Sequence, residues 1–408
     1  MSDSSGEQKL KRRHHTVPRL LLRRFAEGER IVRVPLNGGK RRVVGIADVT
    51  IRRDFYSMRD ASGQLDDTVE DLLAELESKA ATVIRRVIGG AWPLPTEERA
   101  VLAECIAAQH ARIPAARAAH NEVADHLGKV LIAMEGKPGI RRRLKETASG
   151  PVSDEDVDAL WEEVTDFDSY YAEISVNDHM ALMGESMKTA YEVFMTRSWG
   201  LIRFERRPLL IPDHPVTLVR DNDVPRWFGV GIGNAAAILV PIDRRAAILM
   251  ASPGHDDFFV RAHTKLAKEL NQRFADNARR ELFHHPGDDP LDGVELPAIR
   301  DREIQVSQPP QRYLSPEGPS GAFKRTMSEA PEPAHDGESG IGSTKSMVTL
   351  NCRNGPNSGL NVTLMVDDNQ KYLWFLNGAT GANERYRRTS KTAEIGGVRH
   401  VVFEYAPE

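Results

Sequence analysis

The sequence has few of the features that would place it in a specialised class. It has only two cysteines, Cys105 and Cys352, far apart, so a disulfide framework and a cysteine-based zinc module are excluded. No apolar run reaches the roughly 18 residues that a membrane-spanning helix needs. The first residues are polar and then basic, without the apolar core of a secretion signal. We therefore expect a cytoplasmic protein with no membrane partner.

A dominant charge sign is also missing, because 55 Lys and Arg stand against 59 Asp and Glu. This balance excludes a uniformly basic nucleic-acid coat protein and a strongly acidic disordered chain. The distribution is uneven, however: residues 1–53 hold 14 basic and five acidic side chains, whereas 151–190 are strongly acidic. The basic region either binds a phosphate-rich polymer or neutralises the acidic segment. The candidate nucleic-acid contacts are Arg12, Arg13, Arg41 and Arg42.

The chain is long enough, at 408 residues, for two or three domains. Composition predicts a disordered basic arm at 1–13 and a flexible linker at 301–346, which is rich in Pro, Gly and Ser. Between them, 14–300 are expected to form the main α+β domain. Residues 347–408 alternate apolar and polar side chains, which predicts a separate small all-β domain.

Hydrophobic spacing within the main domain predicts a mostly helical middle, with short antiparallel strands before and after it. The expected helices span 17–26, 68–88, 96–113, 115–135, a stretch from 154, 174–197 and 258–283. The expected strands are a hairpin over 30–46 and the segments 199–204, 208–212, 216–220, 237–242 and 246–251.

Two adjacent histidines, His14 and His15, come just before a helix expected to open at Val17 and Pro18. The positive end of a helix disfavours a protonated imidazole, which leaves a nitrogen free to bind a metal or accept a proton. Neighbouring residues in extended chain point to opposite sides, so at most one of the pair should face a given site. The alternative is that both face solvent.

Gln109 and Arg112 are three residues apart and share one face of the helix over 96–113. That face borders an apolar stripe, so a half-buried Arg112 needs an anionic partner. The partner is either a carboxylate of the preceding helix, Glu70 or Glu77, or the phosphate of a ligand. Cys105, on the same helix, is expected to be buried and inert.

Asp213 stands in the segment Pro212-Asp213-His214-Pro215, between two expected strands. Asp is common in turns of this kind, where its side chain bonds the backbone. The end of a strand would also expose its carboxylate to a ligand. Both interpretations stay open.

The opening His15-Thr16-Val17-Pro18, followed by Leu22 and Phe25, resembles a bacterial and phage-associated domain family of unknown function. Its members begin His-x-Val-Pro-x-x-x-Leu-x-x-Phe. Further matches are Phe55-Tyr56, Glu70, Glu77, Gln109, Arg112, Pro114, Trp199, Asp213, Pro215, Val216 and Asn271. The resemblance covers roughly 12–285, with one departure at His214, where members usually have Asn. It implies that His15, Arg112 and Asp213 converge.

These residues lead to the hypothesis that the protein is a phosphoester hydrolase or a nuclease-like effector. Its proposed role is the defence of bacteria against phage. In this scheme His15 is a general base or a metal ligand, and Arg112 and Gln109 bind and orient the phosphate. Glu70 and Asp213 hold a divalent cation (Mg²⁺, Mn²⁺ or Zn²⁺) or orient water. The alternatives are a non-catalytic nucleic-acid-binding or sensor protein, and an interaction module that binds a protein partner through 347–408.

Overall fold

The computed structural model describes residues 12–59, 64–148, 150–221, 229–300, 302–304, 306 and 308–318, and C-terminal strands at 345–351, 361–367, 372–376, 383–395 and 398–405. The chain divides into two compact units, Met1–Ala330 and Pro331–Glu408. Helices and mainly antiparallel sheets make up the first unit, which confirms the α+β class. Most of the predicted arm and linker lies outside the described residues.

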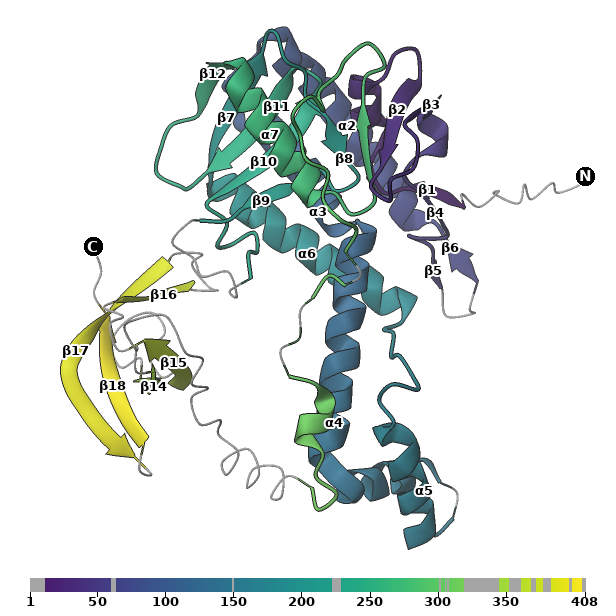
Figure 1. Ribbon diagram of the computed structural model, residues 1–408, viewed down its shortest axis with the longest axis vertical. Helices are drawn as coiled ribbons and strands as arrows, with labels where there is room; N and C mark the ends of the chain where they lie inside the picture. The colour runs from purple at the N-terminus through teal and green to yellow at the C-terminus, as the bar shows by residue number, and fades with distance from the viewer. Residues whose placement is uncertain are drawn as a thin grey trace, which may run out of the picture. The chain divides into compact units, whose positions relative to one another are not determined.

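The N-terminal segment is a set of short elements around a hairpin (Figure 1). Strand β1 (Arg13–His15) pairs antiparallel with β4 (Ile51–Arg53), with His14 opposite Arg52. A short helix α1 (Arg19–Leu22) continues into the 3-10 turn η1 (Arg23–Phe25). The predicted hairpin is confirmed as β2 (Arg30–Pro35) and β3 (Arg42–Gly45), and the 3-10 turn η2 (Ile46–Asp48) leads from it to β4.

Five helices follow a small hairpin of β5 (Met58–Arg59) and β6 (Leu65–Asp66). They are α2 (Thr68–Gly89), α3 (Thr96–Ala111), α4 (Pro114–Thr147), α5 (Asp154–Thr165) and α6 (Val176–Thr196). Helix α2 buries its apolar stripe, as predicted, and ends at Gly90 in the left-handed conformation. Helices α3 and α4 meet at Arg112 and Ile113, where Pro114 takes the first helical position that suits its missing N–H. Helix α4 bends at Gly136.

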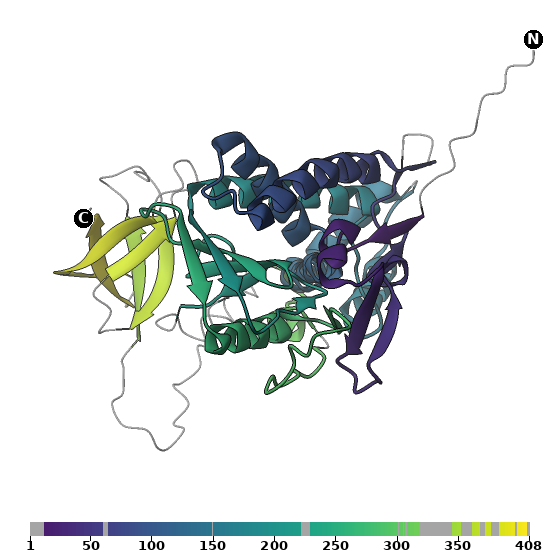
Figure 2. The ribbon, with the colours of Figure 1, turned by 90° about the horizontal axis from the view of Figure 1, so that it is seen from above.

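A five-stranded sheet forms the centre of the first unit, in the order β12-β7-β11-β10-β9. Its strands are β7 (Ser198–Phe204), β9 (Thr217–Val219), β10 (Ala237–Asp243), β11 (Ala246–Ala251) and β12 (Phe258–Ala262). Helices α2 and α3 cover one face, and α7 (Thr264–Asn277) lies on the other (Figure 2). A four-stranded sheet, β3-β2-β13-β8, adds β8 (Ile211–Pro212) and β13 (Glu281–His284) to the N-terminal hairpin.

The helix predicted over 258–283 is wrong at both ends. Residues Phe258–Ala262 form β12, which pairs parallel with β7, and Glu281–His284 form β13. Only Thr264–Asn277 is helical. Both strands pair with partners far away in sequence, and those partners help to bury Leu282 and Phe283 of β13, which local spacing does not reveal.

The second unit contains a five-stranded sheet, which confirms the predicted small β domain. Its order is β15-β14-β18-β17-β16, from β14 (Lys345–Asn351), β15 (Asn361–Asp367), β16 (Tyr372–Leu376), β17 (Asn383–Ile395) and β18 (Val398–Tyr405). Strands β14 and β18 pair parallel, and the other neighbours pair antiparallel. Its use as a docking module stays a prediction.

Part of the segment predicted as a linker packs against α4. It contains the 3-10 turn η3 (Pro310–Tyr313), and the Ser315 backbone N–H donates to the Ala133 carbonyl. In the part of the chain that the structure describes, no helix is long and apolar enough to cross a membrane.

Candidate functional site

A buried polar network surrounds Tyr56, between β1, α2 and α3. The Tyr56 hydroxyl donates to the Arg112 carbonyl at 3.0 Å and contacts the His15 carbonyl at 3.4 Å. Arg112 is 2% exposed, and its guanidinium donates to Oε1 of Glu77 at 2.6 Å. Burial lowers the pKa of Arg112, but Glu77, together with Tyr56 and Cys105, outweighs it, so the net shift is upward. The structure therefore selects Glu77 from the partners expected for Arg112.

Gln109 extends the network toward the N-terminal segment. Its Oε1 accepts weakly from the Arg112 guanidinium, and its Nε2 donates to the Thr16 carbonyl at 3.0 Å. Gln109 and Arg112 thus contact each other, as expected for two residues on one helix face, and Gln109 holds Thr16 in place. Cys105 is buried, as expected, and burial raises the pKa of its thiol to about 12.

His14 and His15 lie in different surroundings. Neither side chain faces solvent fully, so the alternative that both are solvent-facing is wrong. His14 is fully buried, stacks on the Tyr56 ring and accepts the Tyr56 backbone N–H at 2.8 Å. His15 is half-buried, and its Nδ1 has no hydrogen-bond partner within the described residues. Burial lowers the pKa of His15, with further contributions from nearby arginines. A neutral imidazole was expected there, although burial rather than the short helix α1 is the main cause.

Glu70 lies in the first turn of α2. Burial is the main cause that raises the pKa of Tyr56, Arg112 opposes it, and the nearby charges of Glu70 and Glu77 add to the rise. The structure therefore brings together His15, Glu70, Gln109 and Arg112 around Tyr56. Asp213 is in a different place.

Asp213 fixes a turn. Its carboxylate accepts the backbone N–H groups of Arg279, Arg280 and Glu281 at 2.8, 2.8 and 3.2 Å. Asn277 holds the other side of the turn, because its Nδ2 donates to the carbonyls of His214 and Val216. Burial raises the pKa of Asp213, opposed by the three N–H donors. These contacts place the turn firmly against the start of β13.

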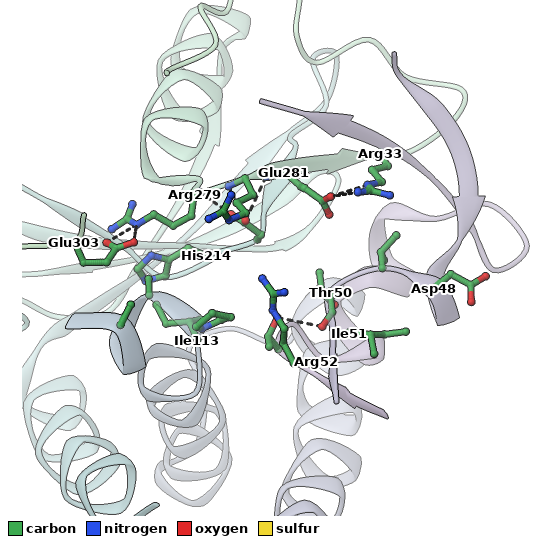
Figure 3. Close-up of a pocket in the computed structure, with 17 residues that line it drawn as sticks. Arg33, Asp48, Thr50, Ile51, Arg52, Ile113, His214, Arg279, Glu281 and Glu303 are labelled. Atoms are coloured by element: carbon green, nitrogen blue, oxygen red, sulfur yellow. Dashed lines mark hydrogen bonds and ion pairs between the residues drawn. The ribbon is translucent and has the colours of Figure 1, made fainter. Parts of the chain in front are cut away.

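A pocket of about 420 Å³ opens beside this turn (Figure 3). One side is formed by Thr16 and by Asp48–Arg52, which join η2 to β4. The opposite side is formed by Asp213 and His214 and by residues 279–281. Residues at the junction of α3 and α4, together with Arg33 and Glu303, complete the lining; the junction residues are Ile113, Pro114, Ala115 and Ala118. Of the five predicted site residues only Asp213 lines this pocket, while the Arg112 network supports it from behind through Thr16 and Ile113.

Four arginines and four carboxylates line the pocket, and within the described residues all four carboxylates are engaged. Glu281 is bound by Arg33, and Glu303 by Arg279 at 2.7 Å. Asp48 pairs with Arg13 at 3.2 Å, and Asp213 accepts the three backbone N–H groups.

Arg52 and Arg280 differ from the other two arginines. Both are exposed, and their guanidinium groups have no carboxylate partner in the described part of the chain. In Figure 3 the Arg52 side chain extends from its strand toward the side that carries Arg279 and Glu281. The lining charges balance in number, but two guanidinium groups stay free of carboxylate partners among the described residues, and a free guanidinium suits an anion.

Thr50 lies in the pocket wall with φ of +55°, in the left-handed region that a β-branched residue rarely adopts. Its carbonyl accepts the Thr16 backbone N–H at 2.8 Å and the Thr16 hydroxyl at 3.1 Å. Strain of this kind persists where neighbouring contacts enforce it, and it concentrates at binding sites. The strained wall is consistent with a functional pocket.

Sequence reasoning missed Arg52 and Arg280 as members of one site. Both stand in Arg-Arg pairs, which was the available signal. They are 228 positions apart, and the pairing of β13 with β2 brings them to the same pocket. The predicted Arg12, Arg13, Arg41 and Arg42 are exposed and outside the pocket lining. Arg12 pairs with Asp54 at 2.7 Å.

The residues expected to bind a metal lie in different places. His15 belongs to the Tyr56 network and Asp213 to the pocket, and no group of three His, Cys, Asp or Glu side chains converges among the described residues. These residues do not fit a preformed metal centre within the described part of the chain.

The chain belongs to the family described as protein of unknown function (DUF4238), whose model matches residues 13–288. The matched region contains both the Tyr56 network and most of the pocket lining. No curated protein and no solved structure matches the chain. The family gives the domain a place among related proteins but no activity.

Proposed function

We propose that the pocket binds the phosphate groups of a nucleotide or of a nucleic-acid strand. The observation that carries the proposal is the pair Arg52 and Arg280, which face the pocket from opposite sides without carboxylate partners among the described residues. A guanidinium presents two parallel N–H donors that match phosphate oxygens. Engagement of the four lining carboxylates leaves this positive charge available to a ligand.

A polymer is favoured over a small ligand because the positive charge continues beyond the pocket. Next to Arg52, the β1–β4 ribbon carries Arg13 and Arg53 opposite one another, with side chains 66% and 72% exposed. The ion pair between Arg13 and Asp48 is exposed, and pairs of this kind contribute little to stability. A phosphate backbone could therefore replace Asp48 at low cost.

The test is binding of a short fluorescent single strand, DNA or RNA, measured by anisotropy. We expect the Arg52→Ala/Arg280→Ala double variant to bind at least about tenfold more weakly, because hydrogen bonds to charged groups contribute about 1.5–3 kcal/mol each. The salt dependence should also fall, by about one unit of slope per lost phosphate contact.

The matched control is Arg261→Ala, which removes an exposed arginine from β12, outside the pocket lining. It should bind like the wild type. Equal affinity of the double variant and the wild type would refute the proposal.

Phosphoester hydrolysis is the second candidate, favoured by the position of His214 beside Asp213 in the pocket. In this reaction a water oxygen would bond to phosphorus and the ester P–O bond would break. The neutral imidazole would accept the proton of the water, and the leaving oxygen would take up a proton from solvent.

Cleavage of RNA, DNA and nucleotides, with and without Mg²⁺, Mn²⁺ or Zn²⁺, should therefore be lost in His214→Asn. A loss in His15→Ala with His214→Asn unaffected would instead assign the reaction to the Tyr56 network. If either loss is found, protection of bacteria against phage plaques by wild type and variant would test the proposed defence role.

A further inference from the structure

His214 is a polar side chain in the pocket that the protein itself leaves unsatisfied. Both ring nitrogens are buried, and neither has a hydrogen-bond partner among the described residues. Leaving a buried polar atom unpaired costs about 1–3 kcal/mol, and most such atoms in native proteins are paired. The residue as a whole is half-buried and lines the pocket, so the atoms it exposes there are not these nitrogens.

The position of His214 is fixed by its backbone. Nδ2 of Asn277 donates to the His214 carbonyl at 2.7 Å, and the preceding Asp213 is anchored by three backbone N–H groups. The unpaired ring is therefore not the result of a loosely held turn. For a nitrogen to contact a ligand in the pocket, the ring has to turn about its side-chain bonds into another rotamer.

The groups around the ring are cationic, neutral or already bound. Arg279, Arg300 and His110 act on it electrostatically, and Figure 3 places Glu303 next to it. Arg279 binds Glu303 at 2.7 Å, and the Asp213 carboxylate accepts backbone N–H groups. Among the described residues the imidazole forms no hydrogen bond with these groups, so a ligand oxygen in the pocket would supply the partner that the ring lacks.

We propose that His214 donates a hydrogen bond to a phosphate oxygen of the ligand and that this contact couples ligand binding to proton uptake. The inference rests on the proposed phosphate-binding function and goes beyond it by assigning the residue and the regulation. The recognised group is the phosphodiester of a nucleic-acid strand.

The direction of the pH effect follows from charge. In the free protein, burial and the neighbouring arginines hold the pKa of His214 well below its ordinary value. A bound phosphate places negative charge beside the ring and moves the pKa back toward that value. The complex then takes up a proton that the free protein does not hold, so affinity rises as the pH falls through the ordinary histidine range.

The experiment measures binding of a fluorescent oligothymidylate from pH 8 to pH 5.5. Its diester phosphates keep their charge over this range, so the ligand itself does not titrate. We expect wild-type affinity to rise by up to about tenfold between pH 7.5 and pH 5.5 if the bound histidine regains a pKa near 6.5. His214→Asn keeps a polar side chain but cannot titrate, so its affinity should stay flat with pH.

Two controls separate the possible failures. His110→Asn removes the neighbouring imidazole, and it should keep the wild-type slope. A slope that survives in His214→Asn, or that disappears in His110→Asn alone, would overturn the assignment to His214. If instead the wild type binds no better than Arg52→Ala/Arg280→Ala at any pH, the phosphate-binding function itself fails. Unfolding curves recorded at each pH show which variants remain folded.

Discussion

The Arg112 guanidinium donates to Oε1 of Glu77 at 2.6 Å, and this ion pair joins α3 to α2 behind the pocket wall. Arg112 is 2% exposed, whereas the Glu77 side chain is 25% exposed. A charge buried to this degree is not available to a ligand in the pocket. We therefore interpret Arg112 as a residue that holds Thr16, through Gln109, and Ile113 in position.

Removing one partner of this ion pair should lower the free energy of unfolding substantially. Arg112→Ala leaves the Glu77 carboxylate without its partner, and we expect a loss of about 3–5 kcal/mol in the free energy of unfolding, measured in urea. Arg112→Met/Glu77→Leu, which removes both charges, should lose less than the single variant. Full stability of Arg112→Ala, together with loss of phosphate binding, would contradict this interpretation and return Arg112 to the ligand site.

The sequence was sufficient for the parts of the fold that are determined locally. Helix α2 carries its apolar residues at helical spacing, and Glu77 falls on the face that meets Arg112, so the pair could be expected from two helix faces. The hairpin of β2 and β3 was predictable for the same reason, because its turn and both strands are adjacent in sequence.

The pocket was not predictable, because it depends on contacts distant in sequence. Arg33 and Glu281 are 248 residues apart, and their pairing brings residues 279–281 to the side of the pocket opposite Arg52. The strand that carries Glu281 was itself expected to be helix. Without the pairing of β13 with β2, nothing in the sequence relates Arg280 to Arg52.

Asp213 should stabilise the fold of the turn rather than take part in a reaction. In Asp213→Asn the amide group would present N–H donors to the backbone N–H groups of residues 279–281, which need acceptors. We expect a loss of about 1–3 kcal/mol in the free energy of unfolding, measured by urea denaturation. Binding of a single strand should weaken as well, because the same contacts position Arg280.

Asp48→Asn is the matched control, since Asp48 also lines the pocket but is exposed and paired only with Arg13 among the described residues. Its stability should stay within about 0.5 kcal/mol of the wild type. If Asp213→Asn kept wild-type stability and lost only cleavage activity, a catalytic role for Asp213 would be favoured over a structural one.

His179 should make the protein sensitive to acid. His179 lies on α6 and is 3% exposed, and its ring stacks on that of His120 with the two ring centroids 6.2 Å apart. Neither ring nitrogen has a hydrogen-bond partner in the described residues. Burial, with Arg117 and His120, lowers the pKa of His179 to about 4, and Asp178 opposes the shift. The folded state therefore favours the neutral ring, and this contribution to stability is present above the unfolded pKa near 6.5 and is lost as the pH falls toward 4.

Between pH 7 and pH 5 the loss due to His179 should be on the order of 2 kcal/mol. His179→Phe keeps an aromatic ring and removes the titration, so its free energy of unfolding should fall less over this range. Urea unfolding at both pH values measures the difference. His255→Phe, at an exposed position, should keep the wild-type pH dependence. Parallel pH profiles for His179→Phe and the wild type would mean that the buried ring is not the source of the acid sensitivity.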